Sequence, residues 1–402
     1  MSRFLFVVPP LTGHVNPTIS VGRELVRRGH DVAWTGPTGT TEQLLPDDVA
    51  FFPAGDASMA EAAGRLRERA QGLRNAAALK FLWEEVLLPL GYAMAGDVEA
   101  LVEGWRPDVV VCDQQALAGA AVARKRGLSW ATSATTTAEL VDPLAAIPHA
   151  ARWIQERLAA FQADVGVADA AAGDLRFSEH LVIVFSSRQL VGPHRSFPPQ
   201  YAFVGPAIDH RPAPEPFPWG WLEPDVPHVL VSLGTLNAEA GERFFRVVAD
   251  ALADEPLQAI LVAHPALVGW RRSIENLLVR PRVPQLQLLP HLDAVVSHGG
   301  HNTVCETLAH GLPMVLAPIR DDQPIIADQV VQAGAGVRVR FGRALPNDVR
   351  RAVRTVLDEP SFGEGARAIR RSFDVAGGAG AAASHLEDLA LARSDHRRHG
   401  AA

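Results

Sequence analysis

A histidine and an aspartate each follow a strongly apolar segment. His14 comes shortly after FLFVVPP, in the sequence GHVNP, and Asp113 is the last residue of PDVVVCD. An imidazole with an ordinary pKa of about 6.5 is suited to remove a proton at neutral pH. A neighbouring carboxylate can hold that imidazole in the required tautomer, as in hydrolases. These residues therefore predict a base and its orienting acid, although a histidine after a strand is more often only structural.

A glycine-rich loop in the second half of the chain has the composition of an anion site. The sequence DAVVSHGG is followed directly by HNTVCETLAHGLPMVLAP. Gly299 and Gly300 would let the backbone approach a ligand, and Asn302 and Thr303 could cap a helix whose N–H groups attract an anion. The loop predicts a diphosphate cradle without a P-loop lysine. The alternative is an ordinary capped helix after a glycine turn.

Two series of alternating strand and helix patterns must position these residues. In the first series strands are predicted at 4–8, 31–34, 107–113, 181–187 and 200–205, with a helix at 17–28. In the second series strands are predicted at 228–235, 258–264, 293–300, 314–318 and 336–340, with a helix at 239–252 and helical sequence from 346 to 392. The predicted fold class is α/β, with two Rossmann-like doubly wound domains facing a cleft. Strand-terminal loops of both sheets would line that cleft.

A proline-rich segment separates the two series. Seven prolines lie from position 206 to position 227, a density that excludes a regular helix or a central strand. The predicted organisation is a domain at 1–207, a linker at 208–227, a second domain at 228–378, and a final helix with a mobile tail at 379–402.

Composition argues against several classes of protein. The 402 residues include 38 basic and 45 acidic side chains, giving a net charge of −7, which disfavours nucleic acid as a partner. Two cysteines exclude a disulfide scaffold and a multi-cysteine zinc site. We expect no signal peptide and no integral membrane segment, and hence a cytoplasmic protein. No two aspartates are separated by one residue, so we expect no metal held by a D-x-D motif.

The sequence HGGHNTVCETLAHGLPMVLAP, followed by DDQP, resembles the donor-binding signature of the family 1 nucleotide-sugar glycosyltransferases, which have the two-domain GT-B fold. The resemblance extends over the whole chain, including GHVNP. It implies a donor site composed of Thr235, Val283, Gln285, His298, Gly300, Asn302, Thr303, Glu306, Asp322 and Gln323. Within that set it implies phosphate contacts from Thr235, His298 and the loop at 300–303, and a ribose contact from Glu306. Val283 and Gln285 would grip the base, and Asp322 and Gln323 would bind sugar hydroxyls.

Two positions depart from relatives of that family. Arg282 stands where many plant relatives have a tryptophan, and Ile326 stands where many bacterial relatives have an asparagine. The sequence is more similar to the bacterial branch, which uses HGG and often takes TDP-sugars. The resemblance also implies that the final helix crosses back to the first domain.

The resemblance implies an inverting glycosyltransferase of natural-product or antibiotic biosynthesis. It would move a hexose or deoxyhexose from a TDP- or UDP-sugar to a small hydrophobic acceptor, without cofactor or metal, as a monomer or homodimer. His14 and Asp113 match the family's catalytic dyad. An apolar acceptor pocket would use Phe81, Trp83, Leu87, Tyr92 and Trp153, unless several of them are ordinary core. A nucleotide-sugar epimerase and a non-catalytic helper of a partner transferase are the alternatives.

Overall fold

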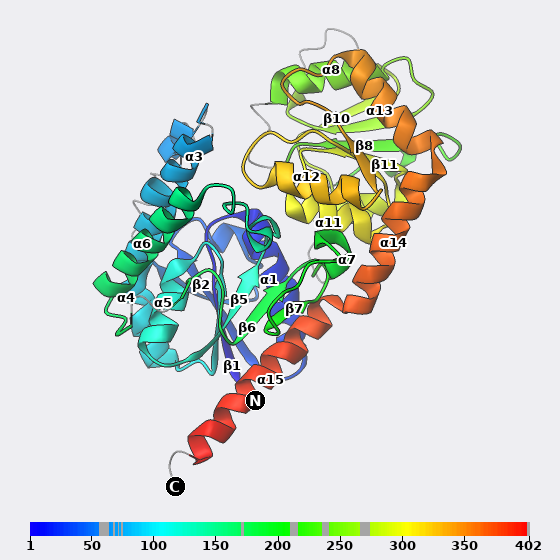
Figure 1. The fold of residues 1–402 in the computed structure, drawn as a ribbon. Coiled ribbons are helices and arrows are strands. Elements are labelled where there is room, and N and C mark those ends of the chain that lie inside the picture. The colour runs from blue at the N-terminus through cyan, green and yellow to red at the C-terminus, as the bar shows by residue number, and fades with distance from the viewer. Residues whose placement is uncertain are drawn as a thin grey trace.

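Two parallel sheets, each with helices on both faces, form the molecule (Figure 1). The computed structural model describes residues 1–55, 64–66, 69–70, 72–73, 75–169, 173–209, 216–234, 241–265 and 274–399. The α/β class with two doubly wound units is confirmed.

The N-terminal sheet has seven parallel strands in the order β3-β2-β1-β4-β5-β6-β7. Its strands are β1 (Arg3–Val7), β2 (Asp31–Pro37), β3 (Ala50–Ala54), β4 (Val109–Asp113), β5 (Ser129–Ala134), β6 (Leu181–Val184) and β7 (Tyr201–Phe203). Strand order reverses between β1 and β4, which pair directly. The loops after these two strands therefore open at one switch point, where α/β sheets bind ligands.

Helices cover both faces of this sheet. They are α1 (Thr12–Arg27), α3 (Asn75–Phe81), α4 (Leu88–Trp105), α5 (Leu117–Lys125), α6 (Pro148–Asp164) and α7 (Arg188–Val191), with a π-helix, η2 (Leu82–Leu87), and 3₁₀ turns η1 (Glu42–Leu44) and η3 (Ala138–Val141). Helix α1 packs closely because it carries a glycine at its contact with β2. A Cβ on Gly22 would lie 2.3 Å from the Trp34 ring. That ring stacks on Phe6 at 5.2 Å, and its indole N–H donates to Thr18 Oγ1 (3.0 Å).

The C-terminal sheet has six parallel strands in the order β10-β9-β8-β11-β12-β13. Its strands are β8 (His228–Ser232), β9 (Gln258–Val262), β10 (Leu277–Arg280), β11 (Ala294–Ser297), β12 (Met314–Leu316) and β13 (Gly336–Arg338). The associated helices are α8 (Glu242–Leu252), α10 (Gln285–Leu288), α11 (His301–Ala309), α12 (Gln323–Gln332), α13 (Pro346–Asp358) and α14 (Pro360–Ala376), with 3₁₀ turns η4 (Trp219–Trp221) and η6 (Leu289–His291). Here the switch point lies between β8 and β11.

Three strands, β3, β5 and β10, lie outside the predicted strands. β5 has the sequence SWATSA, whose hydroxyl groups hide it from a search for apolar segments. Backbone groups satisfy the buried Thr132 hydroxyl, which accepts from the Ser178 N–H (2.8 Å), whereas Ser133 Oγ is buried without a hydrogen-bond partner. The prediction for α1 was also wrong at its start. The helix begins at Thr12, so His14 lies in its first turn and not in a preceding loop.

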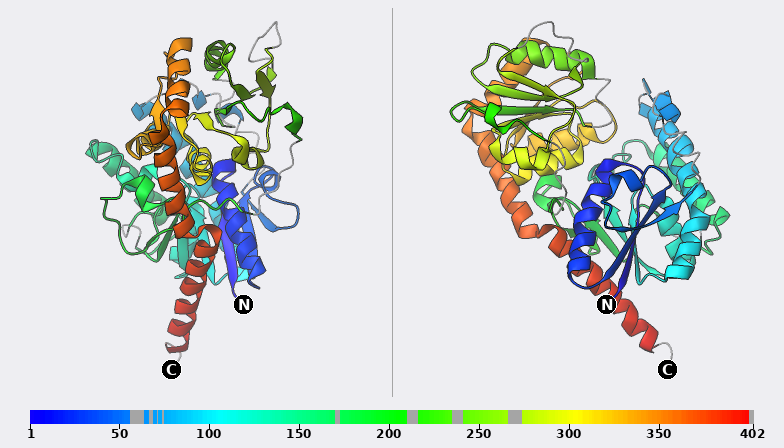
Figure 2. Two further views of the ribbon diagram at one scale, coloured as in Figure 1. Left: turned by 90° about the vertical axis from the view of Figure 1, so that its right-hand side faces the viewer. Right: turned by 180° about the vertical axis from the view of Figure 1, so that it is seen from behind.

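The last helix, α15 (Gly378–His399), leaves the C-terminal unit and packs on the N-terminal one, as the resemblance implied (Figure 2). Helix α14 ends at Gly377, which has a φ of 88° that favours glycine, and the Gly378 N–H donates to the Val204 carbonyl oxygen. The buried face of α15 consists of Ala379, Ala382, Ala383, Leu386 and Ala390. The domain boundaries at 207 and 378 stay predictions.

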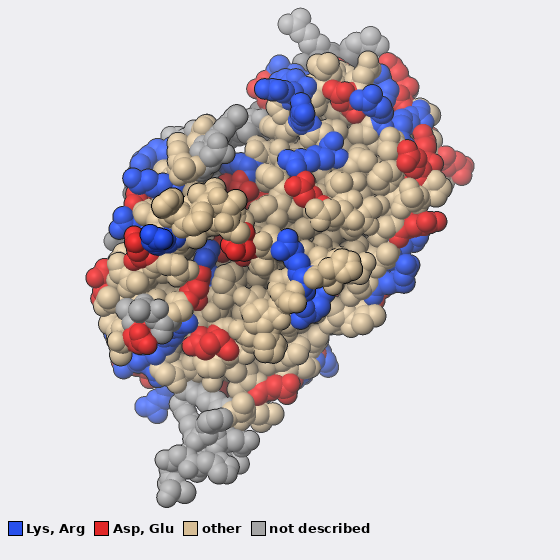
Figure 3. Space-filling view, in the orientation of Figure 1, with Lys and Arg blue, Asp and Glu red and all other residues tan. Residues whose placement is uncertain are grey.

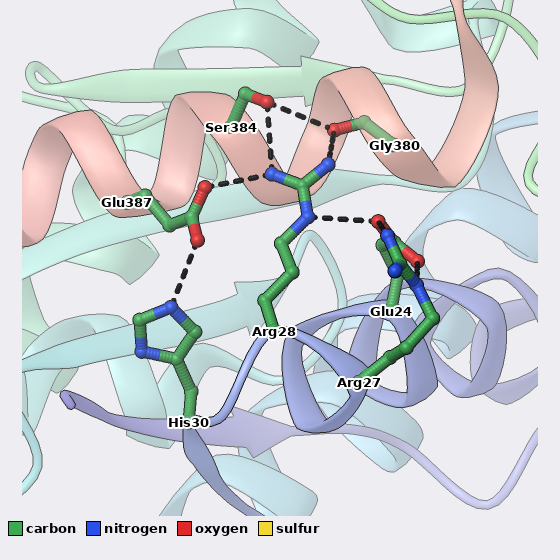
Figure 4. A network of polar contacts seen from close by, with 7 residues as sticks. All are labelled: Glu24, Arg27, Arg28, His30, Gly380, Ser384 and Glu387. Carbon is green, nitrogen blue, oxygen red and sulfur yellow. Dashed lines mark hydrogen bonds and ion pairs between the residues drawn. The ribbon is translucent and has the colours of Figure 1, made fainter.

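A polar network holds α15 against α1 (Figure 4). The Arg28 guanidinium donates to Glu24 Oε1 (2.7 Å), Glu387 Oε2 (2.7 Å) and the Gly380 carbonyl oxygen (2.9 Å). His30 Nε2 lies 2.8 Å from Glu387 Oε1. Two carboxylates from elements about 360 residues apart thus share one guanidinium. Elsewhere, basic and acidic side chains intermix over the face shown in Figure 3.

Candidate active site

His14 and Asp113 meet at the carboxyl edge of the N-terminal sheet. His14 lies in the first turn of α1, after β1, and Asp113 ends the neighbouring strand β4; His14 Nδ1 lies 2.9 Å and 3.0 Å from the two Asp113 carboxylate oxygens. The Asp113 side chain is completely buried, whereas 15% of the His14 side chain is exposed. The Gln115 backbone N–H donates to Asp113 Oδ1 (2.8 Å). This geometry makes Asp113 the acceptor of an Nδ1–H, which leaves Nε2 as the basic nitrogen.

Opposing influences act on the pKa of His14, and the net effect raises it. Burial lowers this pKa, but the charge and hydrogen bond of Asp113 raise it, and Asp322 and Glu139 add to that effect. The contribution of Asp322 is informative because that residue belongs to the C-terminal unit. His14 therefore lies in the electrostatic field of both halves of the molecule.

Thr135 completes the pair and was not predicted. Its Oγ1 lies 2.8 Å from His14 Nδ1 and donates to Asp113 Oδ2 (2.9 Å). It follows β5, and since that strand was missed, nothing in the sequence pattern placed TTT at the same edge as Asp113. Recognising SWATSA as a buried polar strand is the signal that would have found it.

His298 lies at the switch point of the C-terminal sheet, directly after β11. Its ring sits against two glycines: a Cβ on Gly300 would lie 2.5 Å from its Nε2, and a Cβ on Gly234 would lie 2.7 Å from its Cε1. Burial lowers the pKa of His298 to about 4, and a hydrogen bond to the Ser232 backbone opposes this only partly. The imidazole is therefore neutral at physiological pH and carries one N–H. Thr235, the next residue along that loop, lies outside the described residues.

Asn302 connects the two switch points. Helix α11 starts at His301 with Gly300 as its N-cap, and no side chain caps it, so the predicted capping by Asn302 and Thr303 was wrong. Asn302 Nδ2 instead donates to the Gly13 carbonyl oxygen (2.9 Å). That carbonyl is available because its usual helical partner, four residues later, is Pro17, which has no N–H.

The residues predicted to bind the nucleotide base and the ribose lie together at the start of α10. Gln285 Nε2 donates to Glu306 Oε2 (2.5 Å), and Glu306 is buried in α11. Val283 packs at the edge of the apolar core beneath this pair. Thr303 lies in the first turn of α11, where its carbonyl oxygen accepts from Thr307 Oγ1 (2.7 Å).

Asp322 and Gln323 follow β12, but their side chains make different hydrogen bonds. Gln323 Oε1 accepts hydrogen bonds from the backbone N–H groups of Ile319 (2.9 Å) and Arg320 (3.1 Å), so it shapes the turn. Asp322 precedes α12 without capping it, and its Oδ2 accepts from Thr136 Oγ1 across the two units (2.7 Å). Burial raises the pKa of Asp322, while Thr136 and His14 oppose the increase.

The two departures from the family pattern have different environments. Ile326 is completely buried in the C-terminal core, so an apolar side chain replaces a polar one at a packing position. Arg282 is exposed in the loop before α10.

The aromatic residues expected to line an acceptor pocket are divided between core and surface. Trp83 and Leu87 are buried in the N-terminal core, so the alternative of ordinary core holds for them. Tyr92 is 45% exposed, and its hydroxyl donates to Asp164 (2.6 Å). Phe81 and Trp153 are partly buried.

One hollow among the described residues is lined by Pro17, Phe185, Ile208, Asn302, Cys305 and Glu306, with Pro206 and Ala207. It adjoins the predicted donor residues. A more open hollow is lined by Pro318 and residues 338–343, and no predicted site residue that the structure describes lines it. We therefore associate the chemistry with the first region.

Searches for a metal cluster and for a membrane span give negative results over the part of the chain that the structure describes. No three His, Cys, Asp or Glu side chains there are grouped to hold an ion. No helix there has the length and apolar character to cross a bilayer.

Comparisons with known proteins agree with this geometry. The family model for "UDP-glucoronosyl and UDP-glucosyl transferase" matches residues 198–372. 4'-Demethylrebeccamycin synthase from Lentzea aerocolonigenes is 29% identical, over 92% of this chain and 96% of that protein. Demethyllactenocin mycarosyltransferase from Streptomyces fradiae is also 29% identical, over 97% and 87%. The crystal structure of the glycosyltransferase of kitacinnamycin superimposes with a TM-score of 0.76 at 25% identity, over 96% of this chain and 98% of that one.

Fold and site together define a glycosyltransferase with the GT-B architecture. The family match over residues 198–372, the curated relatives and the GT-B structural neighbours together support the resemblance to the family 1 nucleotide-sugar glycosyltransferases that the sequence signature indicated.

Proposed function

We propose that this enzyme transfers a hexose or deoxyhexose from a TDP- or UDP-sugar to a hydroxyl of a small hydrophobic natural-product aglycone, with inversion at the anomeric carbon. His14 is the base and Asp113 its orienting acid. The observation that carries the proposal is the hydrogen bond between Asn302 and the Gly13 carbonyl (2.9 Å). The first turn of α11 thus contacts the residue before His14, which supports a donor phosphate site beside the proposed base.

The transfer requires a proton to leave the acceptor as its oxygen attacks. His14 Nε2 accepts the acceptor O–H proton, the new bond forms between that oxygen and the anomeric carbon, and the bond to the diphosphate oxygen breaks. Asp113 stabilises the imidazolium that results. In the proposed step the acceptor oxygen attacks the face of the anomeric carbon opposite the departing diphosphate, which gives inversion.

The departing diphosphate gains charge that the protein must stabilise. The first turn of α11, with Gly300, Asn302 and Thr303, presents backbone N–H groups and the positive end of its dipole. A neutral His298 would add a contact by redirecting to the phosphates the single N–H that it donates to the Ser232 backbone. Thr235 would add a contact from the loop after β8. These groups take the role that a metal has in transferases with a D-x-D motif, so we propose a reaction without metal or cofactor.

The remaining donor contacts follow the same arrangement. Glu306, held by Gln285, binds the ribose, while Val283 and Gln285 contact the base. Asp322 and Gln323 bind hydroxyls of the sugar. We propose that the acceptor enters beside η3, because this turn directly follows the Thr135–Thr137 segment at the His14–Asp113 edge. A natural-product acceptor is supported by the names of the compared proteins, which refer to rebeccamycin, demethyllactenocin and kitacinnamycin.

The direct test combines a panel of donors and acceptors with mass spectrometry. The purified chain is incubated with UDP- and TDP-sugars and a set of aromatic and macrolide aglycones, with chelator added to half of the samples. We expect a glycosylated aglycone and one released nucleoside diphosphate per transfer, with and without chelator. Interconverted sugar nucleotide without transfer would indicate an epimerase, and activity only with an added partner transferase would indicate a helper.

A substitution at the base separates binding from chemistry. His14→Ala should lower the transfer rate by roughly 10² to 10⁴, the usual contribution of a general base. Calorimetry should show nucleoside diphosphate binding close to that of the wild type, because the phosphates contact the other unit. The base must be neutral, so the wild-type rate should fall as pH falls through the raised His14 pKa, at a pH above about 6.5. Near wild-type turnover in His14→Ala would remove this residue from the mechanism.

A further inference from the structure

Three consecutive threonines follow β5, and each contacts a different part of the site. Thr135 bonds to the catalytic pair, Thr136 to Asp322, and Thr137 to Gln329 of α12. All three are buried, with 4%, 8% and 0% of their surfaces exposed. The segment therefore touches the base on one side and the C-terminal unit on the other.

The Thr135 hydroxyl has a defined donor direction. Its one hydrogen goes to Asp113 Oδ2, at 2.9 Å, because His14 Nδ1 donates its own hydrogen to the same carboxylate. An oxygen lone pair of Thr135 then faces His14 Nδ1, at 2.8 Å. The hydroxyl thus holds both members of the pair but would not touch the reacting atoms.

Thr136 is hydrogen-bonded at the carboxyl edge of the N-terminal sheet and also contacts the C-terminal unit. Gln114, the residue after Asp113, accepts from the Thr136 backbone N–H at 3.4 Å, and Thr136 Oγ1 accepts from the Ala138 N–H at 3.3 Å. The Thr136 hydroxyl donates to Asp322 at 2.7 Å. The hydrogen bonds of Thr136 therefore fix the position of Asp322 relative to β4, the strand that carries Asp113.

We propose that Thr135 and Thr136 are positioning residues that couple the base to the donor-sugar carboxylate across the two units. Thr135 orients the His14–Asp113 pair, and Thr136 sets Asp322 at a fixed place relative to it. The second half of this inference rests on the proposed role of Asp322 as a ligand of sugar hydroxyls. The first half requires only the hydrogen bonds around His14.

The charge around His14 predicts the direction of the effect. The titratable groups that face it are Asp113 on β4, Glu139 in η3, Asp322 before α12 and His301 on α11. Thr135 uses part of the acceptor capacity of Asp113. Without that hydroxyl, the Asp113 carboxylate acts more fully on the imidazolium, and because its charge stabilises the imidazolium more than the neutral Thr135 lone pair does, this gain exceeds the loss of that lone pair. The titration of His14 should then move to higher pH.

Thr135→Val, which keeps the shape of the side chain and removes the hydroxyl, tests the first half. We expect kcat to fall roughly 10- to 100-fold, as for loss of a hydrogen bond to a charged group, with nucleoside diphosphate affinity unchanged. NMR of ¹⁵N-labelled histidine, with His14→Gln to assign the signal, should show the His14 midpoint displaced upward. Thr135→Ser should restore both. The matched control is Thr35→Val, which removes a buried hydroxyl without a hydrogen-bond partner from β2 of the same sheet and should change neither.

An unchanged His14 midpoint and rate in Thr135→Val would overturn the role of Thr135. Equal loss in Thr135→Ser would do the same, because it would assign the effect to the methyl group. If the wild type transfers no sugar at all, the proposed function fails, but the NMR titration still decides whether Thr135 orients the pair.

Thr136→Val tests the second half by comparing two ligands. The KM for the sugar nucleotide should rise roughly tenfold, whereas the Kd for the nucleoside diphosphate, which has no sugar, should stay unchanged. Thr136→Ser should recover most of the loss, and the effects of Thr136→Val and Asp322→Ala should be strongly non-additive. Equal weakening of both ligands, or additive effects, would show that Thr136 is only part of the local packing.

Discussion

His14 presents two chemically different nitrogens. Nδ1 is committed to Asp113 and Thr135, so the proton must be taken up by Nε2. In the proposed mechanism Asp113 sets the tautomer as well as the charge, since an amide at that position could present its N–H to Nδ1 and reverse the ring's protonation. A rate loss in Asp113→Asn is thus a consequence of a specific hydrogen bond.

His301 is a second buried histidine near the site, with a different environment. Its Nδ1 is buried without a hydrogen-bond partner, and its Nε2 lies 3.6 Å from Cys305 Sγ. Burial lowers its pKa to about 4, and Asn302 opposes this only in part. The unfolded chain, with a histidine pKa of about 6.5, therefore binds a proton that the folded chain excludes. Stability should fall as pH falls from about 6.5 to 4.

His301→Leu should reduce this dependence on pH. We expect the wild type to lose more free energy of unfolding between pH 7.5 and pH 5 than the variant, as measured by urea denaturation at both values. The comparison is made within each protein, so an overall change in stability does not affect it. The exposed His385→Gln is the control and should behave like the wild type. Identical pH dependence in His301→Leu would contradict the assignment.

Sequence reasoning reached the residues that follow strong patterns and missed those that depend on backbone. His14 and Asp113 follow apolar strands, and their types indicate acid-base chemistry; the structure brings them together, while their catalytic roles stay predictions. The Gly13 carbonyl could not be anticipated as an acceptor, because it becomes available only when Pro17 lies inside a helix. Thr135 needed a strand that the pattern did not show.

At the scale of elements, the two sheets use the same construction. In each, a neighbouring pair of strands across the switch point brings the decisive residues together: β1 with β4 in one, and β8 with β11 in the other. The other apolar strands of both sheets were predicted, but β10, with the sequence LLVR, was missed. β3 was missed because it contains Pro53, which is tolerated there because β3 lies at the sheet edge. β5 was missed because its sequence, SWATSA, is rich in hydroxyl groups although the strand lies in the sheet interior.

The glycine after β11 should be intolerant of even a methyl group. Alanine can adopt the backbone conformation of Gly300, but a Cβ at this position would lie 2.5 Å from His298 Nε2. Gly300→Ala should therefore displace the imidazole and weaken nucleoside diphosphate binding roughly tenfold, the effect of one lost hydrogen bond to a charged group. Calorimetry measures this directly.

Gly96→Ala supplies the matched control for that substitution. Gly96 is exposed within α4, and a Cβ there would meet nothing within 4 Å. It should raise stability by about 1 kcal/mol through helix propensity and leave binding unchanged. Wild-type affinity in Gly300→Ala would show that His298 does not need its present position.

At the scale of the molecule, α14 and α15 form a second connection between the units, in addition to the proline-rich segment. The resemblance indicated a crossing helix, but periodicity could not show which residues anchor it, because Arg28, His30 and Glu387 come from distant parts of the sequence. The relative placement of the two sheets is likewise set by contacts between units, such as Asn302 with Gly13.

Glu387→Gln should loosen this crossing. The variant keeps the side-chain shape but loses the charge that Arg28 and His30 share, and we expect a lower Tm by a few degrees, on the order of 1 kcal/mol. Amide exchange should accelerate in α15 and α1. Asp388→Asn, one residue along and exposed, should change neither. Unchanged exchange in Glu387→Gln would assign the crossing to apolar packing alone.

The same network has a predictable response to acid. Burial raises the pKa of Glu387, but His30 and Arg28 together lower it by more than burial raises it, so the net shift is downward. Arg27 and Arg28 lower the pKa of Glu24 to about 2. A carboxylate whose pKa is lowered on folding stabilises the protein above its unfolded pKa. That contribution should be present at neutral pH and should decline below about pH 4.5 in the wild type, with a weaker decline in Glu387→Gln.

The path of α15 also determines when the first unit can be completed on the ribosome. The apolar face of the N-terminal unit beside α1 is covered by Ala379, Ala382 and Leu386 of α15. These residues are synthesised about 170 residues after β7. At 5 to 20 residues per second, the N-terminal sheet waits on the order of 10 to 30 seconds with that face exposed. The second unit must emerge, and largely fold, before the first is sealed. Nascent-chain quality control therefore meets an intermediate with an open apolar face, and an early stop anywhere in the second unit would leave the first incomplete.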